Sequence, residues 1–337
     1  MAALVERDAV AKVQDLADEF DNAKSFKFPF MSRISKGAAP KNAKLTYAVE
    51  KYDDVDTDGA VDEADPTEYE NPSEGDAELD VRLQIWEKAV RLGALATTTT
   101  QQSGITPRNV VAQKVAKKLI ELKRNCEATM LSDNESRVDT GAVGNKTRGL
   151  VKWAQATAQS HYPVPTDYLT PSGSINTSTA TADYVDSTIT AVAQSQYDQT
   201  GNEDEENVLF AGSTWKRNLS RITFYARNET NRTIVRTFNQ NSASTVNLGK
   251  VDMLETDFGN IEVQLSQHVN ASSDPTSAAS KLIAVGGPLS NMQLRWSDAP
   301  HMIPLAKTGR NTKFLVTATG ALVVKNPLKL IKFAPSS

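Results

Sequence analysis

A long amphipathic helix over residues 109–132 is the clearest element that the hydrophobic pattern predicts. Its apolar residues recur at steps of three and four, and they are Val111, Val115, Leu119, Leu122, Cys126 and Met130. Charged residues occupy its other faces, namely Lys114, Lys117, Lys118, Glu121, Lys123 and Arg124. Pro107 stands where a missing N–H costs little, and a Ser-Asp-Asn run follows Leu131 as a stop signal. At about 1.5 Å per residue the helix is about 36 Å long, so we expect it to act as a spine for other elements.

Two runs of alternating apolar and polar residues predict a pair of strands. The first covers residues 45–55 and the second contains Leu79, Val81, Leu83 and Ile85 on one side. The segment between them is acidic, contains Pro and Gly and has few apolar residues, which indicates a solvated tip. It is either an ordinary acidic surface loop or a long hairpin that projects to meet a basic patch.

The N-terminal region combines a short helical pattern with an aromatic segment. Residues 5–22 show apolar positions on one face and predict an amphipathic helix. The next stretch, SFKFPFMSRISKG, places Phe26, Phe28 and Phe30 around Pro29 without a helical or sustained strand pattern. We therefore expect an extended arm whose exposed aromatic side chains grip another surface.

The C-terminal half alternates helical and strand patterns, which predicts an α+β fold. Helices are expected over 182–199 and from Ser213 or Thr214 to 226, around a short apolar strand at 207–211. A strand, a tight turn at 257–260 and a second strand follow within 251–266. Further strands are expected at 281–287 and 292–298, and a closing strand pair within 313–333 is broken at Thr319-Gly320.

Charge is distributed very unevenly along the 337 residues. The total is −4, which argues against a strongly basic nucleic-acid binder, yet fourteen acids and only Lys51 lie between Glu50 and Asp80. The rest of the chain therefore carries about +9, so an acidic segment is attached to a basic body. No apolar run approaches the roughly 18 residues that a membrane span needs. We expect no membrane partner and no secretion signal.

The search for catalytic or metal-binding motifs is negative. GAVGNKT superficially resembles a phosphate-binding loop, but the motif requires Gly at positions where Thr140 and Asn145 stand. The three histidines are each isolated in loop-like surroundings, and HExxH, CxxC and GxSxG spacings are absent. The single Cys126 lies on the apolar stripe of the long helix and reads as a core residue. We expect no catalytic, cofactor or metal site, although an α+β enzyme with an unrecognised site remains one alternative.

The order of these segments is similar to that of the major capsid proteins of tailed bacteriophages with the Hong Kong ninety-seven type fold. The similarity rests on SFKFPFMSRISKG, the alternating runs around Tyr47 and Ile85, the helix at 109–132, DFGNIEVQL at 257–265, and LAKTGRNTKFLVTATGALVVKNP at 305–327. Each motif is weak alone, and the specificity comes from their joint order over most of the chain.

The resemblance implies an α+β capsid fold in five parts. These are an N-terminal arm at 1–44, an extended hairpin loop at 45–100, a peripheral domain with the spine helix at 101–148, an axial domain at 149–300, and C-terminal strands at 301–337 that return to the peripheral domain. It also implies a structural protein, not an enzyme, that assembles into hexamers and pentamers around double-stranded DNA. The resemblance further implies assembly in the host cytoplasm and a place in the virion capsid. A different virion component, such as a tail or decoration protein, is another alternative.

The resemblance and the charge pattern together suggest inter-subunit contacts. The candidate residues are Phe26, Phe28, Phe30 and Arg33 in the arm, Tyr47 and Trp86 beside the hairpin, and Asp53, Asp54, Asp56 and Asp58 at its tip. The acids are expected to face Lys or Arg of a neighbouring copy. Besides further copies of the same chain, expected partners are the portal and scaffold or cement proteins.

Overall fold

The structure, a computed structural model, describes most of the chain. The described residues are 27–50, 52, 55, 57, 76–93, 101–103, 106–108, 110–177, 186–201, 206–222, 252–269 and 281–334. The chain divides into two compact units. The first unit includes Glu87–Lys123 and Pro300–Thr317, and the second unit includes Lys27–Trp86, Arg124–Ala299 and Ala318–Ser337.

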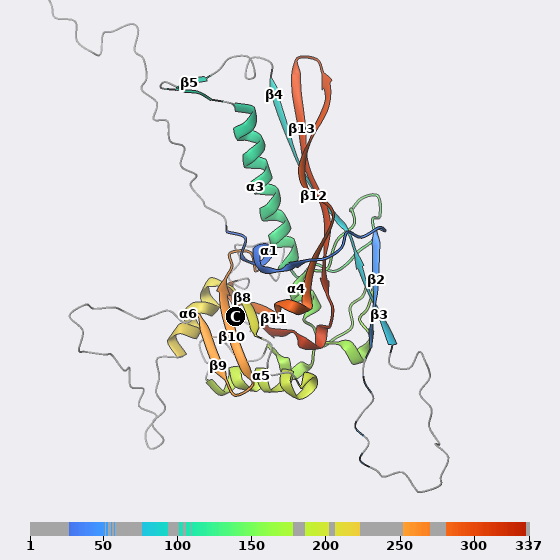
Figure 1. Cartoon of the computed structure of the whole chain (residues 1–337), viewed down its shortest axis with the longest axis vertical. Helices are drawn as coiled ribbons and strands as arrows, with labels where there is room; N and C mark the ends of the chain where they lie inside the picture. The colour runs from blue at the N-terminus through green and yellow to red at the C-terminus, as the bar shows by residue number, and fades with distance from the viewer. Residues whose placement is uncertain are drawn as a thin grey trace, which may run out of the picture. The chain divides into compact units, whose positions relative to one another are not determined.

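The predicted spine helix is confirmed as α3, an unbroken helix at Val110–Met130 (Figure 1). Its apolar stripe becomes fully buried toward the C-terminal end, where Leu122, Cys126 and Met130 have no exposed surface. A small ribbon of β5 (Gln101–Ser103) and β6 (Thr106–Arg108) precedes the helix. Periodicity alone was sufficient here because the helix is long and its apolar positions repeat over several turns.

A four-stranded sheet is built around a long hairpin. Its order is β1 (Ser35–Lys36), β12 (Met292–Thr308), β13 (Asn311–Val324) and β4 (Gln84–Gly93). The chain reverses between β12 and β13 at Gly309, whose φ of 67° suits glycine. β1 pairs with β12 in parallel, with Ser35 opposite Gln293. This pairing ties residues near the N-terminus to a strand near the C-terminus.

A six-stranded mixed sheet forms the centre of the second unit. Its order is β7 (Ile175–Asn176), β14 (Ile331–Phe333), β11 (Ala284–Pro288), β8 (Asn207–Ala211), β10 (Gly259–Leu265) and β9 (Met253–Thr256). All five residues of β8 are buried, because this strand lies between β11 and β10 and is covered on both faces. That position explains its continuous apolar sequence NVLFA.

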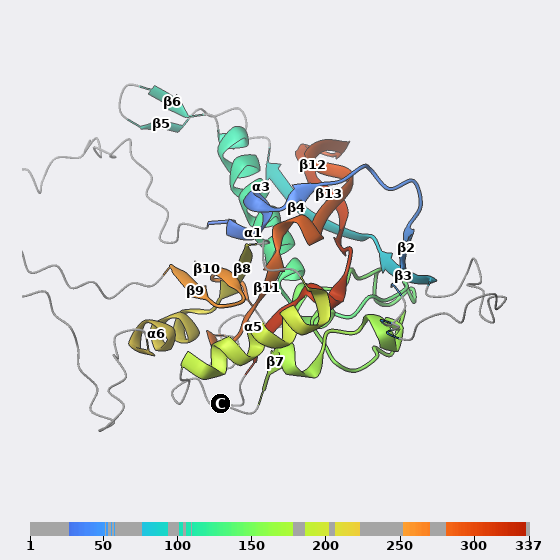
Figure 2. The same ribbon diagram turned by 60° about the horizontal axis from the view of Figure 1, so that its bottom comes forward.

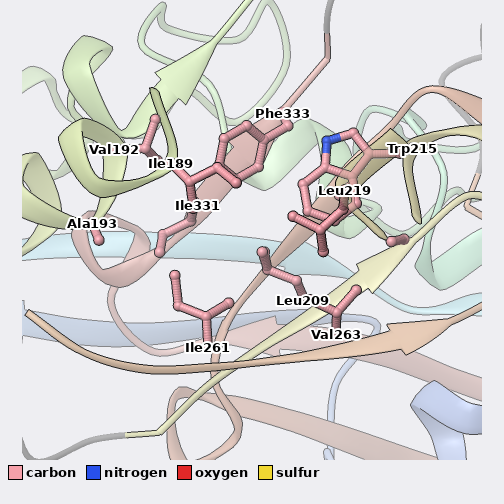
Figure 3. Packing of buried hydrophobic residues seen from close by; sticks show 12 residues of the cluster. Ile189, Val192, Ala193, Leu209, Trp215, Leu219, Ile261, Val263, Ile331 and Phe333 are labelled. Carbon is pink, nitrogen blue, oxygen red and sulfur yellow. The ribbon is translucent and has the colours of Figure 1, made fainter. Parts of the chain in front are cut away.

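Two helices cover one face of this sheet. Ile189, Val192 and Ala193 of α5 (Asp186–Thr200) and Trp215 and Leu219 of α6 (Ser213–Ile222) share one buried cluster with the strands. The strand residues in that cluster include Leu209, Ile261, Val263, Ile331 and Phe333 (Figure 3). Figure 2 shows α5 extended across the sheet. Phe210 and Glu262, which alternate with these strand residues, therefore point to the opposite face.

The remaining described elements are short. β2 (Lys44–Glu50) and β3 (Asp76–Arg82) form an antiparallel hairpin in which Glu50 lies opposite Asp76. Short helices are α1 (Pro29–Arg33) and α4 (Leu150–Trp153), and single 3₁₀ turns lie at Thr166–Tyr168, Ser172–Ser174, Leu289–Asn291 and Pro327–Lys329. The predicted strand pair 45–55 and 79–85 is thus confirmed over 45–50 and 79–82, and most of the tip lies outside the described residues. The last part of the second run is wrong, because β3 ends at Arg82 and β4 begins at Gln84. Ile85 is therefore 62% exposed, whereas Leu79, Val81 and Leu83 are buried.

Most predicted elements of the C-terminal half are confirmed. These are the helix beginning at Ser213, the strand 207–211, the helix in 186–200 and the turn before Gly259, whose φ is 111°. The stretch GAVGNKT is a turn-rich loop, as expected, closed by a bridge between Arg137 and Lys146. The predicted helix at 5–22 lies outside the described residues.

One predicted break is wrong. β13 continues through Gly320 without interruption, and the reversal lies at Gly309 instead. A Cβ atom at position 320 would lie 2.6 Å from Trp296 Cε3 and 2.9 Å from the Arg295 carbonyl oxygen. Glycine is therefore present because the neighbouring strand and indole approach closely, and not because the chain turns.

Gly320→Ala should destabilise the subunit by about 1–3 kcal/mol, because the added methyl overpacks the contact with Trp296. Gly144→Ala is the matched control, since a Cβ there meets nothing within 4 Å. Urea unfolding followed by tryptophan fluorescence compares the two variants. Equal midpoints for both would show that Trp296 moves aside at little cost.

Candidate assembly surfaces

The N-terminal arm is attached to its own chain through Phe30. Pro29 occupies the first position of α1, where no N–H is needed. Phe30 is fully buried and its ring meets Phe210 edge to face, with centroids 5.0 Å apart. This contact places α1 on the sheet face opposite α5 and α6. The prediction that Phe30 is exposed and that the stretch has no helical structure is wrong.

The carboxylate of Glu127 on α3 caps the N-terminus of α1. The backbone N–H groups of Phe30 and Met31 each donate to one of its oxygens, both at 2.9 Å. Phe28, which precedes the helix, supplies no side-chain cap. Glu127, almost a hundred positions away in the sequence, therefore accepts hydrogen bonds from two N–H groups that have no partner within the short helix. Burial raises the pKa of Glu127 to about 7, against the opposing effect of the two N–H groups.

Three further interactions hold the segment after Phe30. Arg33 forms an ion pair with Glu262 of β10, and this hydrogen bond raises the pKa of the guanidinium. The Ser35 hydroxyl donates to the Met292 carbonyl oxygen at 3.0 Å. Beyond β1, the Gly37 N–H donates to the Leu294 carbonyl oxygen at 3.0 Å. Phe28 is half-buried and Phe26 lies outside the described residues.

Tyr47 anchors the base of the hairpin. Its hydroxyl donates to the Val324 carbonyl oxygen, and burial raises its pKa above the ordinary value. On the same pair of strands Lys44 lies 2.7 Å from a carboxylate oxygen of Asp80, and the Thr46 hydroxyl donates to that carboxylate at 2.6 Å. Tyr47 therefore positions the hairpin within its own chain.

Trp86 is also an internal residue. It is 5% exposed, its indole N–H donates to Thr129 Oγ1 at 3.1 Å, and its ring packs edge to face on Trp296 with centroids 5.9 Å apart. The side chain thus joins the start of β4 to the C-terminal end of α3. Sequence reasoning located Trp86 beside the hairpin but did not foresee this burial.

Sequence reasoning missed Arg148, a fully buried cation. Its guanidinium lies over the Trp153 ring at 4.4 Å and donates to the carbonyl oxygens of His161 and Tyr162. Burial lowers its pKa to about 10. No sequence signal marked it, because the partners are backbone carbonyls of a loop that only the fold brings close.

The exposed apolar side chains include two sets whose members lie close together in the sequence. Tyr52 and Val55, just after β2, are 93% and 90% exposed. In β12, the neighbouring residues Met302, Ile303 and Leu305 are also exposed. Contiguous exposed apolar residues are typical of protein contact surfaces. The four candidate aspartates, Asp53, Asp54, Asp56 and Asp58, lie outside the described residues.

The described residues contain no group of three His, Cys, Asp or Glu side chains that could hold a metal ion. Cys126 is buried in the second unit, and burial raises the pKa of its thiol to about 12, so the thiolate nucleophile is not available. Among the described helices, none is long and apolar enough to span a membrane.

Residues 5–335 match the family described as SU10 major capsid protein. This chain belongs to that family. The capsid protein has no match among curated proteins. The family consists of structural capsid proteins, so the alternative that this chain is an enzyme is wrong. The prediction that the chain is a major capsid protein is confirmed.

Solved phage capsids share the fold of the capsid protein. The capsid of cyanophage P-SCSP1u has a TM-score of 0.60 at 12% identity, covering 96% of this chain and 93% of that one. The chain from Mycobacterium phage Bobi has a TM-score of 0.58 at 10% identity over the full length of both chains. The capsid of a native GTA particle has a TM-score of 0.59 at 7% identity, covering 97% of this chain and 96% of that one. The predicted α+β capsid fold is therefore confirmed.

The stability of the unassembled capsid protein should depend on the protonation of Glu127. The folded state binds this proton more tightly than the unfolded chain, because the pKa rises from 4.5 to about 7. The contribution of this proton to the free energy of unfolding is fully present below about pH 4.5 and is lost as the pH rises to about 7. The free energy of unfolding therefore falls by about 3 kcal/mol over this range. Urea unfolding at a series of pH values should show this decline in the wild type and not in Glu127→Gln.

Glu121→Gln is the control for this experiment. Glu121 lies on the same helix, but the hydrogen bond from Lys118 lowers the pKa of its carboxyl. The control variant should keep the decline between about pH 5 and pH 7. If Glu127→Gln kept it as well, another group would be its source.

Proposed function

We propose that the capsid protein assembles into hexamers and pentamers that close an icosahedral head around packaged double-stranded DNA. The observation that carries this proposal is the match to a major capsid protein family over residues 5–335. The exposed apolar side chains of β12 support it, because a shell subunit needs surfaces that only other copies cover. The further partners are the portal and scaffold or cement proteins, and assembly takes place in the host cytoplasm.

We assign the parts of the chain as an arm at 1–44, an extended hairpin loop at 45–100, a peripheral domain at 101–148 and an axial domain at 149–300. The six-stranded sheet supports an axial domain, because five of its strands come from 175–288. The C-terminal strands at 301–337 are assigned to the peripheral domain, with one amendment. β14 pairs with β11 and β7, so we place Ile331–Phe333 with the axial sheet.

The candidate contact residues divide into two groups. Phe30, Arg33, Tyr47 and Trp86 have partners in their own chain, and we assign them the role of holding the arm and the hairpin in position. Phe26, Phe28 and the four aspartates at the hairpin tip are the residues we propose for direct contact with another copy. Their individual contacts need not be strong, because each subunit makes many at once.

Electron microscopy of the capsid protein expressed alone, with sizing chromatography alongside, tests the proposal. Closed shells, tubes or isolated rings of five and six are the expected result. A monomer that persists at high concentration and after addition of lysate from infected cells would contradict shell assembly.

Replacement of Asp53, Asp54, Asp56 and Asp58 by Lys should impair assembly and leave the circular dichroism of the monomer unchanged. The reason is that like charges would then meet across the interface. Electron microscopy and sedimentation measure shell yield. Replacement of the same residues by Asn is the matched control and should impair assembly less. Normal shells from the Lys variant would contradict an electrostatic role of the hairpin tip.

A further inference from the structure

Tyr162 has a strained backbone conformation. Among the described residues it is the only one other than glycine with a positive φ, which is 52°. A bulky residue rarely adopts this conformation, because its Cβ atom then lies too close to the following carbonyl oxygen. Such strain persists only where the surrounding structure imposes it, and it is found most often at functional sites. The neighbours of Tyr162 must therefore hold it in place.

The fully buried guanidinium of Arg148 holds this backbone. Its Nη2 atom donates to the carbonyl oxygens of both His161 and Tyr162. Its Nε and Nη1 atoms have no hydrogen-bond partner among the described residues, and Arg148 forms no ion pair with them. The His161 N–H in turn donates to Glu135 Oε1 at 2.8 Å. The two hydrogen bonds of a buried cation are thus made to the strained residue and the residue before it.

The side chain of Tyr162 contacts both strands of the β2–β3 hairpin at its base. Lys44 and Arg82 lie opposite each other in the pairing of the two strands. Lys44 Nζ lies 5.8 Å and Arg82 Cζ lies 5.6 Å from the centroid of the Tyr162 ring. Arg82 Nε also donates to the Tyr162 hydroxyl at 2.9 Å. Since cations are attracted to the face of an aromatic ring, one side chain connects the two strands to the loop at 159–164.

Core contacts hold the opposite face of the hairpin base. Side chains alternate along a strand, so Leu79 and Val81 point to the face away from Tyr162, and both are buried. Tyr47, directly opposite Leu79, points the same way and donates to the Val324 carbonyl oxygen. The base is therefore held on one face by the core and on the other by the Tyr162 ring. Contacts on both faces fix the direction in which the hairpin extends.

We propose that the loop at 159–164 is a latch, held by Arg148, whose Tyr162 ring fixes the direction of the β2–β3 hairpin in the subunit before it assembles. Arg148 and Tyr162 are positioning residues, because they act through the hairpin. A latch accounts for both unusual observations, the buried cation without a paired acid and the tyrosine with a positive φ. The inference rests on the proposed shell assembly and names residues that prepare the subunit for it.

An ordinary surface turn is the competing explanation of this loop. Gly, Asn and Asp are favoured at turn positions with a positive φ, because they adopt it at little cost. Any of them would remove the strain at position 162, but each would also remove the ring that contacts Lys44 and Arg82. The observations therefore favour a role of the Tyr162 side chain itself.

Tyr162→Gly separates the ring from the backbone conformation. Glycine adopts a φ of 52° without strain, so the loop keeps its fold and only the ring contacts are lost. Amide hydrogen exchange of the unassembled capsid protein should become at least about tenfold faster at 44–50 and 76–82, because the hairpin opens locally more often. Amides of β8 and β11 should exchange as in the wild type. A uniform increase over the second unit, or none in the hairpin, would overturn the inference.

His161→Gly is the matched control for this experiment. It gives the same loop the same backbone freedom, but it removes an exposed side chain and leaves the Tyr162 ring in place. Hairpin exchange should stay near the wild-type rate, and an increase equal to that of Tyr162→Gly would overturn the role of the ring. Tyr162→Phe keeps the ring and loses only the hydroxyl that accepts from Arg82. Its increase should therefore be smaller than that of Tyr162→Gly.

Arg148→Lys tests the cation that holds the latch. Lysine keeps the charge but lacks the planar guanidinium that donates to two carbonyl oxygens from one fixed position. Exchange should become faster both at 159–164 and in the hairpin, and less so in β8 and β11. Wild-type exchange in the loop and the hairpin would overturn the role of Arg148.

Shell yield, measured by electron microscopy and sedimentation, connects the latch to assembly. Tyr162→Gly should lower the yield and Tyr162→Phe should lower it less, in the same order as their hairpin exchange. A wild-type yield from Tyr162→Gly despite faster hairpin exchange would overturn the inference and leave the proposed function standing. Absence of shells from the wild-type protein would instead count against the proposed function. The exchange measurements use the unassembled subunit, so the two failures are distinguishable.

Discussion

The buried carboxylate of Glu127 is the constraint on which the arrangement of the second unit depends. It receives two backbone N–H groups of α1, and so it connects the C-terminal end of the spine helix to the start of the arm. An uncompensated carboxylate in this position would be costly, so α1 must stay where its donors meet it. With α1 held there, Phe30 packs on Phe210 and Arg33 meets Glu262, both on one face of the six-stranded sheet.

Aromatic and apolar residues that look alike in the sequence divide into two kinds, those that pack within their own chain and those that remain exposed. Phe30, Tyr47 and Trp86 were all plausible contacts for another copy, yet each is used within its own chain. Tyr52, Val55 and the residues Met302, Ile303 and Leu305 of β12 remain exposed. The assembly that we propose needs both kinds, because an arm or hairpin reaches a neighbouring copy in a defined direction only if its base is rigidly held. The internal aromatic residues supply that rigidity.

The uneven charge distribution gives the assembly a simple physical logic. The segment between Glu50 and Asp80 holds fourteen of the 41 acids with only Lys51 beside them, whereas residues 87–123 and 300–317 hold ten Lys and Arg against two Glu. In the shell that we propose, the acidic segment of one copy meets a basic surface of another, so the charges of different copies compensate one another. Such contacts are individually modest and salt-sensitive, which suits an assembly that must correct errors before it closes.

Several features could be predicted from the sequence because their causes are local. The long apolar repeat determined α3, and the alternation of apolar and polar residues determined the base of the β2–β3 hairpin. Gly259 marked the turn between β9 and β10. The clustering of acids between Glu50 and Asp80 is likewise a property of composition. The order of these segments was sufficient to suggest a capsid protein.

Tertiary structure alone decided which residues face inward and which glycine marks a turn. The sequence predicted a break at Thr319-Gly320, but glycine is required at 320 by the close approach of Trp296, and the chain reverses at Gly309. Buried Arg148 donates to the carbonyl oxygens of His161 and Tyr162, in a loop that only the fold brings close. Buried Glu127 accepts from N–H groups that lie almost a hundred positions away in the sequence. Periodicity records only neighbours a few residues apart, so it determines the elements. Partners that are about a hundred residues away become visible only when the chain is folded.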